Sequence, residues 1–307
     1  LPAINKIRNL KIKIIFSKNK NKISSKILKN VEHEKNWKNI FKKDIDLIIL
    51  AVPPKLQEKI ILFNLKYKKR IIFEKPISSN YLTSKKIVEK LKKNQIKSEV
   101  NLTYLNHKLF QKVKQIIDNK SLGSIENFRI YWDFVSSDFN KKIKSWKTDE
   151  TKGGGIKNIF LTHVFAYCEF FFKRLSLEKS KIKISKFKGI KYKRHIFIRL
   201  NNPKKIQGNI SVFIKKNGPQ THKIDVNFKN GRVQLFTKSK DWTRNFVLKI
   251  YYNKTNKIKI YKNMHNNFFK DGRSFQIYSM LKNHLKRPNF KNLEYCLKAE
   301  KLNNRLV

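Results

Sequence analysis

The chain has 307 residues, which is enough to bury the core of one large domain or two medium ones. It contains no run of about eighteen apolar residues, so neither a transmembrane helix nor a membrane partner is expected. Its two cysteines, Cys168 and Cys296, give neither a disulfide framework nor the spacing of metal ligands. These features predict a cytoplasmic protein without a metal site.

The formal net charge is +51, from 72 Lys and Arg against 21 Asp and Glu. A charge of this size normally indicates a nucleic-acid partner. Here the lysines are spread along the whole chain together with abundant Ile and Asn, as the codons of an AT-rich genome produce. No zinc-finger spacing or aromatic RNA-binding signature accompanies them. We therefore expect no specific nucleic-acid partner, only nonspecific binding to polyanions at low salt.

The first hundred residues alternate between apolar, strand-like runs and helix-like stretches. This alternation predicts a doubly wound, parallel α/β sheet of the Rossmann type. Ser79 or Asn80 is the expected cap of its last helix. The expected strands are 10–16, 47–52, 70–73 and 96–102, and the expected helices are 22–29, 36–42, 56–67 and 81–93.

The pattern changes after residue 105, where strand-like runs joined by short turns predict a mostly antiparallel sheet. Asn230-Gly231 lies between two of these runs and predicts a type I′ hairpin. We therefore expect two domains, 1–105 and 106–307. The expected strands are 125–134, 194–200, 207–214, 222–228, 233–236, 247–252 and 257–261, and the expected helices are 107–119, 156–172, 274–284 and 293–306.

Two proline-containing motifs end consecutive apolar runs in the first domain. Pro53-Pro54 follows one run, and Glu74-Lys75-Pro76 follows the next, with a helical stretch between them. Ligands of parallel sheets bind at the carboxyl ends of the strands, and a lysine at such an end can donate a proton or polarise a carbonyl. The alternative is an ordinary βαβ unit whose prolines merely end the strands.

A second motif, Trp146 to His163, contains a tryptophan, three consecutive glycines and a helix with a histidine. Together the two motifs resemble the glucose–fructose oxidoreductase and inositol dehydrogenase family, Gfo/Idh/MocA, whose members are NAD(P)-dependent sugar and polyol oxidoreductases. The resemblance implies a Rossmann domain followed by an α+β domain with an open sheet. It also implies hydride transfer at a hydroxyl or keto carbon of a sugar, nucleotide-sugar or polyol, and homo-oligomers formed through the open sheet.

The resemblance assigns roles to particular residues. Lys75 is the implied proton donor and substrate anchor, and His163 is the implied acid/base or hydroxyl ligand. Tyr104 is equally well explained as a buried aromatic residue. For His163 the alternative is a core histidine, but the glycine run, the spacing and the Glu-Lys-Pro motif favour the site role. The further implied site residues are Pro53, Pro54, Glu74 and Pro76 on the cofactor side, and Tyr104 and Trp146 on the substrate side.

Three positions depart from the pattern of this family. Ile159 occupies the position of an Asp that lies four residues before the histidine, on the same helix face. Gln57 stands where a His is common, and Leu105 where an Arg is common. Because Ile159 can neither carry a proton nor orient an imidazole, an alternative interpretation is a non-catalytic family member that acts as a binding or scaffold subunit.

The beginning of the chain also departs from the family, because no glycine precedes Gly123. A complete dinucleotide-binding domain opens with a strand and a G-x-G-x-x-G turn, so we expect the first strand and the phosphate loop to be missing from this sequence. The alternative is a protein that never bound a dinucleotide. Ser17 and Lys18 follow the expected second strand, where an acidic residue would favour NAD, and they favour NADP instead.

Overall fold

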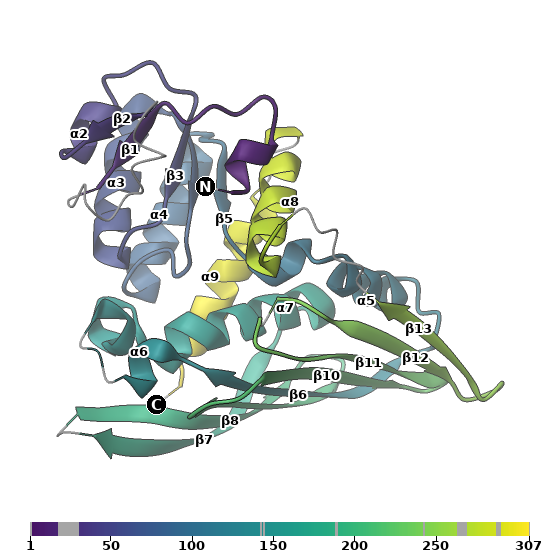
Figure 1. The fold of residues 1–307 in the computed structure, drawn as a ribbon. Helices are drawn as coiled ribbons and strands as arrows, with labels where there is room; N and C mark the ends of the chain where they lie inside the picture. Colours follow the sequence, from purple (N-terminus) through teal and green to yellow (C-terminus); the bar gives the residue numbers. More distant parts are fainter. Residues whose placement is uncertain are drawn as a thin grey trace.

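The structure is a computed structural model, and it describes residues 2–17, 31–141, 143, 145–187, 190–241, 243–262, 269–286 and 290–306. Short parallel strands with their helices form one part of the molecule, and a large sheet forms a second layer below them (Figure 1). The expected helix at 22–29 lies outside the described residues. None of the described helices is both long and apolar enough to cross a bilayer.

The parallel strands of the first hundred residues are divided between two sheets. The first sheet has two strands and the second has three, and within the described residues no hydrogen-bonded ladder joins the two sheets. The predicted parallel architecture is confirmed, but it is not one continuous sheet. The strands are β1 (Ile14–Phe16) with β2 (Glu32–Glu34), and β3 (Leu47–Leu50), β4 (Arg70–Phe73) and β5 (Ser98–Val100).

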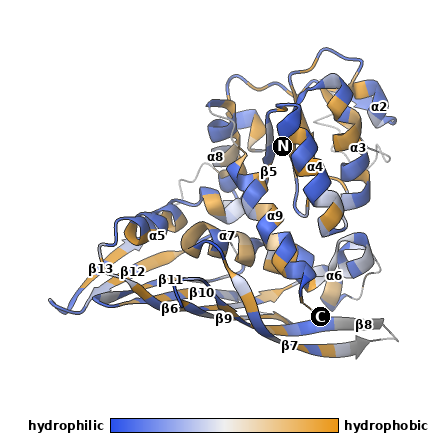
Figure 2. Cartoon of the chain, turned by 180° about the vertical axis from the view of Figure 1, so that it is seen from behind, coloured by the Kyte–Doolittle hydropathy of each residue, from blue (hydrophilic) through white to orange (hydrophobic). Residues whose placement is uncertain are grey.

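Helices connect these strands and bury one apolar stripe each. α3 (Pro54–Tyr67) begins with Pro54 in its first turn, where the missing N–H of proline costs nothing. Asn80 caps α4 (Tyr81–Lys93), because its side chain accepts a hydrogen bond from the backbone N–H of Thr83. Figure 2 shows hydrophilic and hydrophobic residues on both helices, as expected for helices that cover a sheet. The remaining short helices of this part are η1 (Ile4–Lys6), α2 (Trp37–Ile40) and η3 (Thr103–Asn106).

The large sheet has eight strands in the order β13-β12-β11-β10-β6-β9-β8-β7. Every neighbouring pair is antiparallel except β6 with β9, so the predicted, mostly antiparallel sheet is confirmed. The sequence analysis missed β7, whose lysine-rich sequence alternates apolar and polar residues only over the short stretch 181–185. The strands are β6 (Ile125–Val135), β7 (Ser176–Phe187), β8 (Ile190–Asn201), β9 (Gln207–Lys215), β10 (Gln220–Phe228), β11 (Gly231–Ser239), β12 (Val247–Tyr252) and β13 (Lys257–Lys262).

The hairpin between β10 and β11 forms, but the predicted turn type is wrong. Phe228 pairs with Gly231, so the two-residue loop is Lys229-Asn230 rather than Asn230-Gly231. Neither loop residue has the positive φ that a type I′ turn requires. Gly231 serves a different purpose: a Cβ there would lie 2.2 Å from the carbonyl oxygen of Tyr251 on the neighbouring strand.

Helices α5 (Lys108–Asp118) and α7 (Thr162–Phe172) lie on the face of the large sheet that is turned toward the parallel strands (Figures 1 and 2). The predicted helix at 156–172 is not a continuous α-helix. Its first part, η6 (Lys157–Leu161), is a π-helix that passes directly into α7. Such π-turns are rare and occur frequently at functional sites. The short helices before it are α6 (Ser137–Asn140), η4 (Trp146–Thr148) and η5 (Glu150–Lys152).

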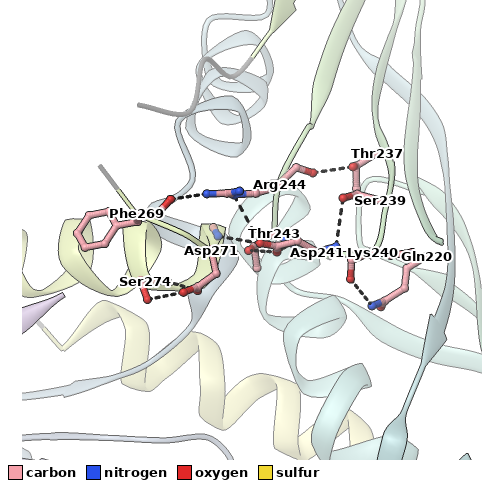
Figure 3. Close-up of polar contacts among 11 residues, drawn as sticks. Gln220, Thr237, Ser239, Lys240, Asp241, Thr243, Arg244, Phe269, Asp271 and Ser274 are labelled. Atoms are coloured by element: carbon pink, nitrogen blue, oxygen red, sulfur yellow. Dashed lines mark hydrogen bonds and ion pairs between the residues drawn. The ribbon is translucent and has the colours of Figure 1, made fainter. Parts of the chain in front are cut away.

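The two C-terminal helices return to the parallel strands. α8 (Gly272–Lys286) is attached to the loop after β11, where Asp241 accepts hydrogen bonds from the backbone N–H groups of Gly272 and Thr243 (Figure 3). α9 (Lys291–Asn304) packs against α4 and β5 on one side and against α7 on the other. The proposed domain boundary at residue 105 stays a prediction, and both helices, which follow it in the chain, pack against elements that precede it.

Candidate active site

Lys75 lies two residues after the end of β4, at the carboxyl end of a parallel strand. Its Nζ donates a hydrogen bond to the backbone carbonyl of Ile159 in η6. Burial lowers the pKa of Lys75 from 10.5 to about 8, although the charge of Glu74 and the neighbouring Cys296 raise it. A lysine with a pKa near neutrality can both donate and accept a proton at physiological pH.

The proline pair and the glycine run come together at the carboxyl end of β3. Gly153 has a φ of 83°, and a Cβ on it would lie 3.0 Å from Cγ of Pro54 and 3.2 Å from Cα of Ser79. At Gly154, a Cβ would lie 2.0 Å from the carbonyl oxygen of Trp146. The glycines are therefore required because the backbone passes close to these groups, and their packing joins the two sequence motifs.

His163 lies in the first turn of α7, and only 6% of its surface is exposed. Burial, the positive charge of Lys75 and the nearby His222 together hold the pKa of His163 well below its usual value. The imidazole is therefore neutral at physiological pH. Lys75 and His163, which are far apart in the sequence, are close enough in the fold for the ammonium to affect the imidazole.

Tyr104 lies beside His163 in a buried aromatic cluster. Its ring packs edge-on against His163, with 5.6 Å between centroids, and it is only 2% exposed. Its hydroxyl lies 3.2 Å from Nδ1 of His222, while the hydroxyl of Tyr167 lies 3.0 Å from Nε2 of that histidine. Burial lowers the pKa of His222 to about 3, so this ring is neutral. Contact of Tyr104 with a substrate stays a prediction.

The other residues with predicted roles belong to several separate elements of the fold. Ser17 follows β1, where its backbone N–H donates to the carbonyl of Glu34 at 3.2 Å. Trp146 is half-buried in η4, and Lys18 lies outside the described residues. Their roles, like those of Pro53, Pro54, Glu74 and Pro76, stay predictions.

The sequence analysis treated Gln57 only as a departure from a family pattern, but the structure shows that it holds the Lys75 loop. Its Nε2 donates to the carbonyls of Glu74, Pro76 and Ile77 at 2.7, 2.9 and 3.1 Å. Its Oε1 accepts from the N–H of Glu74 at 3.1 Å, and the residue is 1% exposed. A polar residue in the buried stripe of α3, three residues before Ile60, is a sequence signal for such a role.

Glu300 holds the same loop from α9 and was also missed. Its Oε1 accepts a hydrogen bond from the backbone N–H of Ile77 at 2.7 Å, and the residue is 5% exposed. Burial raises the pKa of Glu300 from 4.5 to about 7. Among the described residues, His, Cys, Asp and Glu side chains form no cluster of three or more that is placed to hold a metal ion.

The raised pKa of Glu300 predicts a specific dependence of stability on pH. Between pH 4.5 and about 7 the folded protein keeps a proton that the unfolded chain releases, so this stabilisation is lost as the pH rises through about 7. Glu300→Gln does not titrate. From pH 5 to pH 8 the parent should therefore lose up to about 3 kcal/mol more unfolding free energy than the variant. Urea unfolding of both proteins at the two pH values checks this, and equal losses contradict it.

Two family models match consecutive parts of the chain. The model described as an oxidoreductase family with an NAD-binding Rossmann fold matches residues 1–102, and the GFO/IDH/MocA C-terminal domain matches residues 110–234. A similar curated protein is an uncharacterized oxidoreductase of Schizosaccharomyces pombe, which is 27% identical over 116 residues. That alignment covers 37% of this chain and 30% of the length of the yeast protein.

Solved structures of similar fold include KijD10, a 3-ketoreductase from Actinomadura kijaniata in complex with NADP and TDP-benzene. Its TM-score is 0.79 at 13% identity, covering 99% of this chain and 90% of that one. Levoglucosan dehydrogenase is also similar, with a TM-score of 0.74 at 14% identity, covering 95% and 85% of the two chains. At these identities the likeness shows the fold alone. From the two family models, the chain belongs to the Gfo/Idh/MocA family of oxidoreductases with an NAD-binding Rossmann fold.

Proposed function

We propose that this protein is an NAD(P)-dependent oxidoreductase that transfers hydride at a hydroxyl or keto carbon of a sugar, nucleotide-sugar or polyol. The observation that carries the proposal is Lys75, whose pKa is lowered to about 8 by burial at the carboxyl end of β4, beside the neutral His163. Similar structures support the substrate class, because their names include a 3-ketoreductase and levoglucosan dehydrogenase. We place the protein in the cytoplasm and propose homo-oligomers formed through the large sheet.

The donor set at this site fits the nicotinamide end of a dinucleotide. Lys75, Glu74 and Pro54 lie at the carboxyl ends of adjacent parallel strands, where such ligands bind. The phosphate end is different, since no glycine precedes Gly123 and the glycine run of residues 153–155 packs against Pro54 and Ser79. The proposed assignment concerns the residues around the nicotinamide. When bound, the nicotinamide supplies the hydride donor or acceptor that no side chain provides.

The side chains divide the proton chemistry between them. The Lys75 ammonium donates a proton to the substrate oxygen during reduction of a ketone, and the neutral amine accepts it during oxidation of an alcohol. The carbonyl of Ile159 accepts a hydrogen bond from Nζ and so fixes the direction of the ammonium. His163, neutral at physiological pH, is a hydrogen-bond partner for a neighbouring substrate hydroxyl rather than the acid.

A direct test measures turnover of a library of sugars, nucleotide-sugars and polyols with NADPH and NADH. Binding of each cofactor is followed separately by fluorescence transfer from tryptophan. Reduction or oxidation of one substrate class supports the proposal. Cofactor binding without turnover of any member favours the second candidate, a non-catalytic binding or scaffold subunit. One observation favours that candidate. The Lys75 ammonium donates a hydrogen bond to the backbone carbonyl of Ile159, a residue at the position where the family has a carboxylate.

For the cofactor, we propose a preference for NADP. Ser17 and Lys18 follow β1 without an acidic residue to hold a ribose hydroxyl, and a lysine there suits a 2′-phosphate. Lys18→Glu is therefore expected to reverse the preference from NADPH to NADH. The ratio of the dissociation constants for the two cofactors checks this. Tighter binding of NADH by the parent, or an unchanged ratio in the variant, contradicts it.

Restoring a carboxylate at position 159 tests the departure from the family pattern. Ile159 lies in η6 and His163 in α7, and Ile159 is half-buried close to Lys75. In Ile159→Asp the backbone carbonyl remains for Lys75, and the new negative charge favours the ammonium. The pH midpoint of turnover should rise by about one unit or more, while Ile159→Asn should leave it unchanged. An identical pH profile in both variants and the parent contradicts this expectation.

A further inference from the structure

The last helix, α9, contacts both halves of the proposed site. Figure 1 shows it running from the parallel strands to α7. Glu300 and Asn303 lie three residues apart on this helix, so they occupy neighbouring positions on one of its faces. Both are buried, although glutamate and asparagine are normally exposed.

Each of these two residues holds a different catalytic segment. The Glu300 carboxylate accepts a hydrogen bond from the backbone N–H of Ile77, which lies two residues after Lys75. Asn303 donates through Nδ2 to the backbone carbonyl of Lys157 at 3.1 Å and to the hydroxyl of Thr162 at 2.9 Å. Lys157 opens the π-helix η6, and Thr162 precedes His163.

The bond that spans the site is the one from Lys75 to the carbonyl of Ile159. The length of this hydrogen bond depends on the separation between two segments. One is the loop after β4, among the parallel strands, and the other is the π-helix, which leads into α7 on the large sheet. Glu300 and Asn303 fix these two segments to one rigid helix. Other contacts also hold these segments, since Gln57 donates to the loop after β4 and Lys157 Nζ donates to the carbonyl of Leu306 just beyond α9.

We propose that Glu300 and Asn303 are positioning residues, which hold Lys75 and the helix of His163 at the separation that catalysis needs. The proposal rests on the proposed function, because it assigns these residues to the same site. Neither side chain contacts the reacting atoms. Misplacement of a catalytic group by about 1 Å can cost on the order of 10²-fold in rate, so a positioning role has a large expected effect.

Three substitutions that keep the approximate size of the side chain, together with one control variant, separate a positioning role from an effect on overall stability. Glu300→Met removes the acceptor for the N–H of Ile77, whereas Glu300→Gln keeps it. Asn303→Leu removes the donor to Lys157 without adding charge. Asn304→Leu is the matched control, because Asn304 is exposed on the same helix. Thermal unfolding is recorded for each variant, and all assays are run well below its unfolding temperature.

Two measurements on the 307-residue chain decide the question. The first is turnover, where Glu300→Met and Asn303→Leu should each lower kcat roughly 10- to 100-fold with little change in KM. Glu300→Gln and Asn304→Leu should stay close to the parent. The double variant should lose no more than the worse single variant, since both act through one alignment.

The second measurement needs no activity and no cofactor. The rate at which acetic anhydride labels Lys75 is followed against pH by mass spectrometry. In the parent the midpoint should be about 8, and in Glu300→Met and Asn303→Leu it should move toward the ordinary value of 10.5 as Lys75 is released. The titratable groups that face Lys75 are Glu74, Cys296 and His163. Asn303→Leu alters none of their partners, whereas Glu300→Met removes the hydrogen-bond acceptor of the Cys296 thiol, so Asn303→Leu is the cleaner test.

The outcomes distinguish this proposal from the proposed function. Parent-like midpoints of Lys75 labelling in both Glu300→Met and Asn303→Leu overturn the positioning role. If Lys75→Ala abolishes turnover while these two variants keep it, the function stands and the positioning role fails. If the parent turns over no substrate, the proposed function fails, and the labelling midpoint alone then decides whether α9 fixes Lys75.

Discussion

Replacing Lys75 by alanine is expected to lower turnover about 10²-fold or more, the usual scale for removing a general acid or base. The physical reason is that burial lowers the pKa of Lys75 to about 8, while His163 stays neutral and cannot donate in its place. His163→Ala should therefore cost less than Lys75→Ala. Steady-state rates on a substrate that the parent converts measure both effects.

Two further lysine variants serve as controls for this experiment. Lys75→Arg keeps the positive charge but does not release a proton at physiological pH, so it should remain as impaired as Lys75→Ala. Lys69 also donates from Nζ to a backbone carbonyl, that of Ile45 at 3.0 Å, but it lies at the opposite end of β4. Lys69→Ala should keep parent-like turnover. Full turnover by Lys75→Ala would remove Lys75 from the mechanism.

The same pKa sets the direction of the pH profile. Reduction of a ketone requires the ammonium, so its rate should fall as the pH rises through about 8. Oxidation of an alcohol requires the amine, so its rate should rise over the same range. Both changes should disappear together in Lys75→Arg.

Elements with strong local signals were predicted well from the sequence. β4 and α4 have the bounds that were expected, because an apolar run of β-branched residues and an asparagine cap are local features. β2 and β7 were missed, since both are rich in charged residues and their pairing with neighbouring strands is not visible in the local sequence. The turn at Lys229-Asn230 was misassigned because a close contact across strands, rather than a positive φ, requires Gly231.

The candidate site was predicted only in part. The motifs pointed to Lys75 and His163, and the fold places them close together, with the proline pair against the glycine run. The bond from Lys75 to a π-helix carbonyl was not predictable, because it depends on a backbone irregularity and on contacts across the fold. Gln57 and Glu300 were missed for a similar reason: both bind backbone groups, and a sequence motif does not show backbone contacts.

Loss of the Gln57 side chain should lower both stability and turnover. Gln57→Leu is similar in size but leaves three buried carbonyls and the N–H of Glu74 without their present partner. An unsatisfied buried polar group costs about 1–3 kcal/mol, so the unfolding free energy should fall by about 3 kcal/mol or more. Turnover should also fall at least about 10-fold, because Lys75 lies in the loop that Gln57 holds.

Asn64 provides a matched control on the same buried stripe of α3. Its Nδ2 donates to the carbonyl of Lys69 at 2.8 Å and its Oδ1 accepts from the N–H of Lys69, so it holds the loop before β4 instead of the one after it. Asn64→Leu should therefore lower the unfolding free energy but leave turnover per folded molecule unchanged. Urea unfolding and active-site-normalised rates of both variants separate the two effects. Equal losses of turnover in Gln57→Leu and Asn64→Leu would show that Gln57 acts through stability alone, whereas a loss confined to Gln57→Leu ties the rate to the placement of Lys75.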